Sequence, residues 1–197
     1  MRHARLGFPA RAACLLGALA ATLAAGLAMP DAAERHADSP ETALHFWAGE
    51  WDCYSVSDGR LSGRNVLELR VNGKVLHEAW ASEGQDYIGE SWNHYDASAR
   101  VWRQLWVDQQ GNVFSGAADA SDEQRSPGDG LLFEGEQIKP DGDVTQIRMH
   151  VRPVAEGWVR QTGTQLGDNG EWTPRYDLVY VPEGEPFDPA KLKAPNN

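Results

Sequence analysis

The stretch LELRVNGKVLHEAW, residues 67–80, contains two apolar runs joined at Asn72-Gly73. An Asn-Gly pair is the strongest short-range signal for a two-residue β-hairpin turn, in which both turn positions require positive φ. Side chains alternate between the two faces of a strand, so counting outward from the turn sorts these residues into two sets. One face holds Leu67, Leu69, Leu76, Glu78 and Trp80. This hairpin therefore predicts a carboxylate that points inward among apolar side chains.

Similar runs, rich in Val, Trp, Tyr, Leu and Thr, follow along the chain and alternate with glycine-containing turns. No helical pattern separates them, which excludes a sheet built from parallel β-α-β units. The pattern is typical of an all-β fold, either an antiparallel up-and-down barrel or a two-sheet sandwich. The domain spans residues 40–182, and its predicted strands, about ten, are 50–57, 63–71, 74–82, 86–95, 101–108, 112–119, 130–138, 143–152, 157–166 and 172–181.

The two ends of this domain have a different pattern. Before the first strand, Ser39 can cap a helix, Pro40 suits its first position and Gly49 can end it. These residues predict one short N-terminal helix over residues 40–48. The tail after the last strand, residues 183–197, is rich in proline and cannot continue a strand.

The first residues have the pattern of a secretory signal. Three arginines precede an uncharged run of mostly alanine and leucine that ends at Ala28. We expect a signal peptide at residues 1–28, cleaved after Ala28, and a flexible linker at residues 29–39. A membrane anchor is the alternative, but the apolar run is shorter than the roughly 20 residues of a membrane span. The expected location is therefore periplasmic or secreted, with no stable membrane insertion after cleavage.

The acidic composition limits the possible partners. The formal net charge is −11, and removal of the signal would take away three arginines and no acidic residue. An acidic chain repels phosphate backbones, so we expect no nucleic-acid partner. Anionic membrane surfaces are disfavoured for the same reason.

Three segments carry a resemblance to a known family. HFWAGEWDCY, in which a short helix leads into Gly49-x-Trp51, resembles the opening motif of lipocalin-like (calycin) barrels. YDASARVWRQLWVDQQGNVFSG and DNGEWTPRYDLVYV resemble segments of a bacterial calycin-like family catalogued as a domain of unknown function. The resemblance covers about residues 44–181 and implies a closed antiparallel barrel with a central cavity. It implies no catalytic residues.

The hairpin around residues 109–111 indicates how the interior is filled. Counting from this turn places Trp106 opposite Phe114, Gln104 opposite Gly116 and Trp102 opposite Ala118. Bulky side chains opposite small ones suggest an interior layer that leaves room for a ligand. The other face of this hairpin is also apolar, and it contains Leu105, Val107 and Val113.

The last hairpin, counted from the turn at residues 168–170, predicts a second inward charge. Arg160 shares a face with a group of apolar residues, namely Trp158, Leu166, Trp172, Tyr176, Leu178 and Tyr180. A lone buried charge costs several kcal/mol unless it is paired, so we expect Glu78 and Arg160 to meet, directly or through a ligand or water. A buried ion pair of this kind has a structural role as readily as a functional one. A register error of one residue would instead leave both groups in solvent.

The sequence contains no pattern typical of a metal site, a haem site or a catalytic nucleophile. Counting from the nearest turns places His77 and His150 on the outward face, and no histidine pair has metal-ligand spacing. We therefore expect no metal and no cofactor. Cys53 is the one cysteine after the predicted signal, so it cannot form an intramolecular disulfide.

Three functions remain open. The first is binding of a small apolar or amphipathic molecule in the lumen of an exported barrel. The second is an isomerase or lyase that uses Glu78 as general acid or base and Arg160 to stabilise an oxyanion. The third is a ligand-free interaction module of the cell envelope that docks through its outer apolar face. The candidate ligand contacts are Glu78, Trp80, Trp102, Gln104, Trp106, Arg160 and Tyr176. The oligomeric state is left open.

Overall fold

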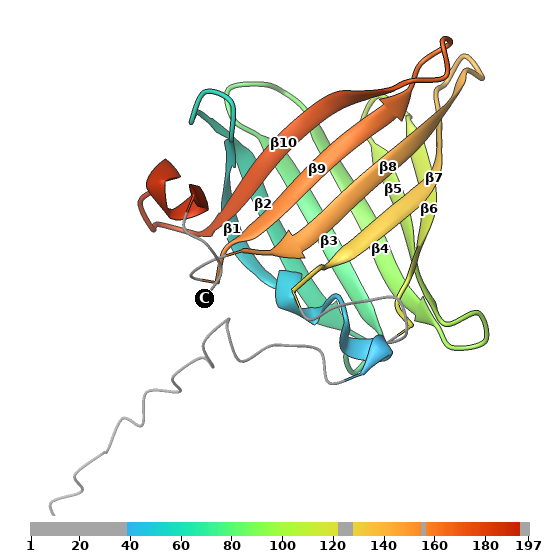
Figure 1. The fold of residues 1–197 in the computed structure, drawn as a ribbon, viewed down its shortest axis with the longest axis horizontal. Coiled ribbons are helices and arrows are strands. Elements are labelled where there is room, and N and C mark those ends of the chain that lie inside the picture. The colour runs from blue at the N-terminus through green and yellow to red at the C-terminus, as the bar shows by residue number, and fades with distance from the viewer. Residues whose placement is uncertain (1–38, 122–127, 155–156, 194–197) are drawn as a thin grey trace, which may run out of the picture.

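The protein folds as a closed antiparallel barrel of ten strands, in which each strand pairs with its neighbours in the chain (Figure 1). The computed structural model describes residues 39–121, 128–154 and 157–193. The strands are β1 (Gly49–Ser55), β2 (Leu61–Arg70), β3 (Val75–Ser82), β4 (Ile88–Asp96), β5 (Val101–Asp108), β6 (Val113–Asp119), β7 (Leu131–Ile138), β8 (Val144–Pro153), β9 (Val159–Leu166) and β10 (Trp172–Pro182). Pairing of β1 with β10 closes the barrel. The predicted all-β, up-and-down barrel is confirmed, while the predicted signal peptide lies outside the described residues.

Two short 3-10 turns close one end of the barrel. They are η2 (Pro40–Thr42) and η3 (His45–Trp47), and they replace the single helix predicted over residues 40–48. Their hydrogen bonds run from residue i+3 back to residue i, as from Trp47 N to Leu44 O (3.1 Å). The indole N–H of Trp102 donates to Pro40 O (2.9 Å), and a ring nitrogen of His45 lies 2.9 Å from Gly73 O. These contacts seal the end of the barrel that carries the β2–β3 and β4–β5 loops (Figure 1).

The main apolar core occupies the closed half of the lumen. The ring of Trp47 packs edge-on to Tyr180 at 5.7 Å, and both side chains are buried. Other fully buried side chains in this cluster are Leu44, Leu76, Trp102, Leu131, Phe133 and Val151. A barrel of ten strands is wider than one that side chains alone fill, so the other half of the lumen has room for a cavity.

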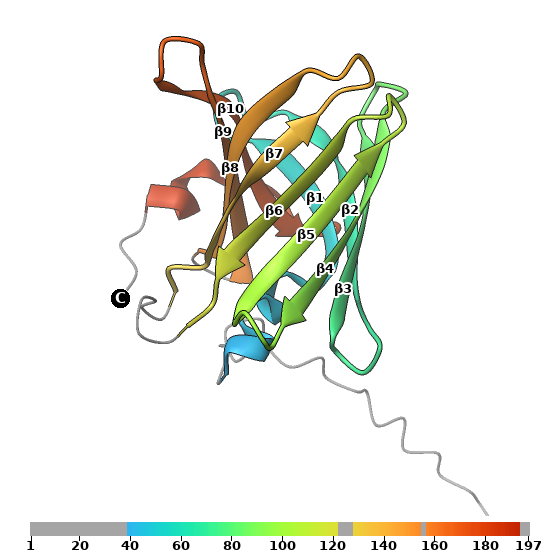
Figure 2. The same ribbon diagram turned by 90° about the vertical axis from the view of Figure 1, so that its right-hand side faces the viewer.

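The chain that follows β10 lies against the outside of the barrel (Figures 1 and 2). Its described part ends in η6 (Pro189–Lys193), and the ring of Phe187 stacks on Tyr54 of β1 at 4.9 Å. Together with Trp158, Val179 and Val181 they form a second apolar cluster, which we call the outer clasp. The prediction that Trp158 faces the lumen is wrong, because the C-terminal segment buries it on the outside.

Strand register follows the predicted count at two hairpins. Asn72 and Gly73 have φ of 54° and 81°, and Leu67 lies opposite Glu78 as counted from them. In the β5–β6 hairpin, Trp106 lies opposite Phe114 and Gln104 opposite Gly116. The inward direction of Glu78, Gln104 and Trp106 is thereby confirmed.

The β9–β10 hairpin departs from the count because of a bulge. Trp172 lies opposite Leu166 as counted, but the register shifts between Pro174 and Tyr176. A bulge inserts one extra residue and reverses the faces beyond it. Tyr176 consequently faces inward opposite Gly163, whereas Arg160 lies opposite Val179 on the outer face. Trp172, also predicted to face inward, packs under the Arg148 guanidinium, which bonds to Glu134 outside the barrel.

Candidate functional site

A cavity of about 620 Å³ occupies the half of the lumen away from η2 and η3. Its rim includes Gln85, Tyr87, Gln137 and Arg175, which lie near the β3–β4, β7–β8 and β9–β10 loops. Antiparallel strands place these loops at the end opposite the sealed one. A volume in this range is typical of sites for small molecules, which usually measure about 300–1,000 Å³.

Aromatic rings form much of the cavity wall, and strand glycines make room for them. A Cβ atom added at Gly89 would lie 2.2 Å from the Trp106 ring, and one at Gly163 would lie 2.4 Å from the Tyr176 ring. Trp80 packs in the same way over Gly63 at 2.7 Å, and Phe114 over Gly116 at 2.5 Å. The rings therefore occupy the space where Cβ atoms would stand in other residues, which leaves the middle of the lumen open. Ile147, Met149 and Leu178 complete the apolar wall.

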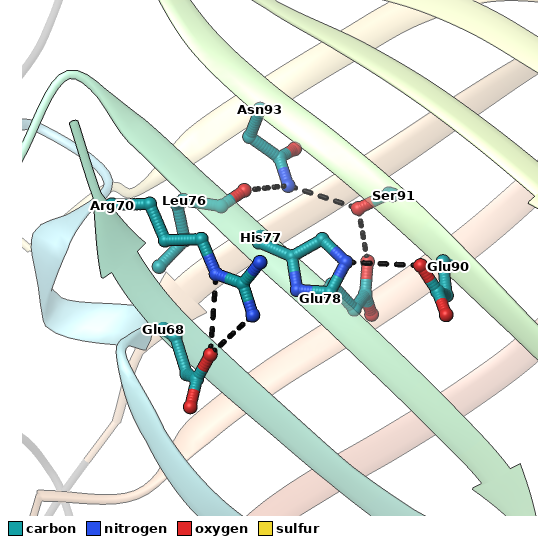
Figure 3. A network of polar contacts seen from close by, with 8 residues as sticks. All are labelled: Glu68, Arg70, Leu76, His77, Glu78, Glu90, Ser91 and Asn93. Atoms are coloured by element: carbon teal, nitrogen blue, oxygen red, sulfur yellow. Dashed lines mark hydrogen bonds and ion pairs between the residues drawn. The ribbon is translucent and has the colours of Figure 1, made fainter.

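Glu78 lies at the inner end of this cavity and is 3 % exposed. Asn65 Nδ2 donates to one of its carboxyl oxygens and Ser91 Oγ to the other, each at 2.6 Å. Asn93 Nδ2 in turn donates to Ser91 Oγ (2.9 Å) and to the backbone oxygen of Leu76 (3.0 Å), as Figure 3 shows. Two neutral donors thus hold the carboxyl group from β2 and β4.

The hydrogen bonds continue to both sides and form a polar belt across the lumen. Gln104 Nε2 donates to Asn93 Oδ1 (2.9 Å). On the other side, Asn65 Nδ2 also donates to the Tyr180 hydroxyl (3.3 Å), which donates to Gln161 Oε1 (2.8 Å). The residues of this polar belt are Asn65, Glu78, Ser91, Asn93, Gln104, Gln161 and Tyr180, all of them buried.

Burial raises the pKa of Glu78 above its ordinary value. The hydrogen bonds from Ser91 and Asn65 oppose this shift, because they favour the charged form, and so does His77 on the outer face. Burial also raises the pKa of Tyr176 and of Tyr180, and the charge of Glu78 adds to both shifts. The two phenols therefore stay neutral at ordinary pH.

Asn65 is incompletely paired. Its amide nitrogen serves Glu78, while its buried Oδ1 has no hydrogen-bond partner among the described residues. Leaving a buried acceptor unsatisfied costs about 1–3 kcal/mol. The unpaired Oδ1 of Asn65 therefore lowers the stability of the fold, while the Nδ2 of the same side chain donates to the carboxyl group of Glu78.

The outer face of the same strands is separate from the cavity. His77, next to Glu78 on β3, points the other way, with a ring nitrogen 3.0 Å from Glu90 Oε2 (Figure 3). Its ring is tilted against that of Trp92, with the ring centres 5.1 Å apart. Glu68 and Arg70 pair on this face too. The predicted outward direction of His77 is confirmed.

The structure brings together five of the seven predicted ligand contacts. Glu78, Trp80, Gln104, Trp106 and Tyr176 line the cavity. Trp102 does not, because it lies fully buried in the closed half. Arg160 points outward, where Nε and Nη2 donate to Asp177 at 2.8 and 2.6 Å. The prediction that Arg160 meets Glu78 is wrong, and the bulge in β10 is the reason.

Other cavity residues were not among the sequence candidates. Arg175 lies at the bulge itself, and its Nη1 donates to Gln137 Oε1 (2.7 Å) at the rim. No local sequence signal identifies that position, since the bulge is a property of strand pairing. Asn65 donates to Glu78 but is not among the residues that line the cavity. It has the same parity as Leu67 in the Asn-Gly hairpin, so the count that places Glu78 inward also places Asn65 inward.

Within residues 39–121, 128–154 and 157–193 there is no cluster of three His, Cys, Asp or Glu side chains suited to a metal ion. Cys53 is buried with a free thiol, whose pKa burial raises. Of the helices in these ranges, none has the length and apolar character needed to cross a membrane.

Comparison with known proteins adds no functional assignment. No protein-family model matches the chain, and no curated protein matches its sequence. The resemblance to a bacterial calycin-like family stays a prediction.

Proposed function

We propose that this barrel binds a small amphipathic molecule in its lumen. The observation that carries the proposal is the cavity of about 620 Å³, walled by aromatic and aliphatic side chains and ending at a buried carboxyl group. Sites of this kind use the apolar wall for affinity and a few fixed polar groups for orientation. Each buried methylene group of a ligand contributes about 0.8 kcal/mol, before the entropy lost on binding is subtracted.

The walls and the polar belt have different tasks in this proposal. Trp80, Trp106 and Tyr176 contact the apolar body of the ligand, and their rings are held in place by the glycines beneath them. Glu78 and Gln104 meet a polar group at the inner end. A ligand with an apolar body and a polar end is therefore bound in a single orientation.

We further infer that the protein works in the periplasm or outside the cell. The support is the pattern of residues 1–28, in which three arginines precede an apolar run. Its acidic composition agrees with a soluble protein that does not bind nucleic acid. Mass spectrometry of the protein recovered from the producing cells would test this by locating its first residue.

Tryptophan fluorescence provides a direct test of ligand binding. Trp80 and Trp106 line the cavity, so a bound alkyl-chain amphiphile is expected to shift or quench their emission saturably. Leu178→Trp would fill the cavity and abolish the signal, whereas Leu105→Trp, on the half-exposed outer face, would leave it unchanged. If both variants respond alike, or if no amphiphile gives a saturable change, the proposal is wrong.

An enzyme remains a second candidate because the raised pKa of Glu78 suits a general acid or base. Its expected partner Arg160 is engaged by Asp177 on the outer face, so the oxyanion role assigned to it has no support. The enzyme hypothesis requires turnover that is lost in Glu78→Gln while binding is retained.

A further inference from the structure

We propose that the inner end of the cavity selects a ligand with a primary ammonium group, which Glu78 pairs with directly. The inference rests on the proposed function and names the chemical class of its ligand. It starts from the charges of the lining: of the described cavity residues, Glu78 is the acidic one and Arg175 the basic one. Arg175 lies at the rim, so the two ends of the cavity differ in sign.

Glu78 is held by neutral groups. Among the described residues, its carboxyl oxygens accept hydrogen bonds from Asn65 and Ser91, and no Lys or Arg forms an ion pair with it. Each carboxylate oxygen has two lone pairs, so each keeps one acceptor site after these bonds are made. A buried carboxylate without a counter-charge is costly, and a cationic ligand would supply that charge.

The other groups that face Glu78 are neutral or act as acceptors. Cys53 of β1 and Tyr180 of β10 lie close enough for the charge of Glu78 to raise their pKa further, which keeps both uncharged. Tyr176 responds in the same way. Gln104 uses its amide nitrogen on Asn93, which leaves its carbonyl oxygen as an acceptor on the cavity side. His77 is the further titratable group near Glu78, but it points to the outer face.

An ammonium group matches this arrangement. It has three donors and no acceptor, which suits the Glu78 carboxylate together with the Gln104 carbonyl oxygen. The positive charge of Arg175 disfavours the same group at the rim, so the bound ligand is oriented with its ammonium end toward Glu78. The negative charge of the whole chain, −11, adds a general attraction for cations.

The test compares n-octylamine, n-octanol and n-octanoate, which share one chain length and differ in the head group. Binding is followed by titration calorimetry at neutral pH. The expected order is octylamine first, octanol next and octanoate last. Glu78→Gln is expected to weaken octylamine at least about 30-fold, as loss of a buried charge partner does, and to change octanol by less than about threefold.

Glu90→Gln is the matched control, because Glu90 is a carboxylate on the outer face of the neighbouring strand. It is expected to leave all three affinities unchanged. The affinity for octylamine should also decrease as the pH is lowered, since the amine needs ionised Glu78, whereas the affinity for octanol should stay constant.

The outcomes separate this inference from the proposed function. Equal binding of octylamine and octanol, tighter binding of octanoate, or unchanged amine binding in Glu78→Gln would overturn the inference and leave a binding cavity. If none of the three compounds binds the wild-type protein, the proposed function fails as well.

Discussion

Glu78 is the residue on which the functional argument depends. Its burial is confirmed, and its hydrogen bonds come from two neutral side chains in place of the predicted arginine. A buried acid of this kind is a burden on folding at neutral pH, because the charged form loses hydration that two hydrogen bonds only partly replace. A buried acid that lowers the stability of the fold in this way is typical of a functional residue.

The raised pKa of Glu78 predicts how stability changes with pH. Because burial raises the pKa in the folded state, the stability that the protonated group contributes is complete below the unfolded pKa and is lost as pH rises through the folded one. Glu78→Gln removes this dependence. We therefore expect the variant to gain stability relative to wild type as the pH rises from the ordinary pKa of glutamate toward neutral. The gain is about 1.4 kcal/mol for each pH unit that separates the folded pKa from the unfolded pKa.

Urea unfolding of both proteins at several pH values measures this difference. Glu90→Gln is again the control, and it should follow the wild type. A stability difference between Glu78→Gln and wild type that is constant over the whole range would show that Glu78 ionises normally.

At the level of the strands, glycines determine the shape of the cavity. Gly89 and Gly163 lie within strands, where glycine weakens a sheet, and each has an aromatic ring from an adjacent strand packed where a side chain would begin. The sequence shows bulky residues opposite small ones only in the β5–β6 hairpin. The other ring–glycine pairs emerge once strand order and register are known.

Gly163→Ala tests this packing. The new methyl group would meet the Tyr176 ring at 2.4 Å and push it toward the lumen. We expect a loss of about 1–3 kcal/mol in unfolding free energy, as in other overpacked interiors, together with weaker amphiphile binding.

A double-mutant cycle identifies the cause. Tyr176→Leu removes the ring, so Gly163→Ala should cost clearly less in that background than in the wild type. Equal costs in the two backgrounds would mean that the glycine is needed for its backbone and not for the ring above it.

For the whole molecule, closure of the barrel joins the two ends of the domain. The β1–β10 seam pairs Cys53 with Tyr180, which are far apart in the sequence. The outer clasp lies over this seam, since Tyr54 belongs to β1 and both Val179 and Val181 belong to β10. The C-terminal segment, predicted only as a tail, thus covers the point of closure.

Phe187→Ala is expected to weaken this closure. Loss of its half-buried ring, which stacks on Tyr54, should lower the unfolding free energy by about 1–3 kcal/mol. Hydrogen exchange should accelerate most at the amides of β1 and β10, with little change in amphiphile binding because the ring lies outside the lumen. Uniform acceleration over all strands would argue against a local role for the clasp.

The sequence alone determined the features that depend on nearest neighbours. Strand positions follow from apolar runs and turns, and the inward direction of Glu78 follows from parity beside Asn72-Gly73. The same short-range logic accounts for the pairs Gln104–Gly116 and Trp106–Phe114. Alternation has a period of two, so over a few residues it is reliable without further information.

Only the tertiary structure decided the features that depend on distant pairing. The bulge between Pro174 and Tyr176 places Val179, and not Leu178, opposite Arg160, which therefore lies on the outer face. The same bulge places Arg175 at the rim. Trp102 entered the sealed end because η2 packs against it, a contact between segments far apart in the chain. The alternation of side chains depends only on adjacent residues in a strand. Bulges, closure of the barrel and the packing of η2 against its end depend instead on how segments far apart in the sequence pack together.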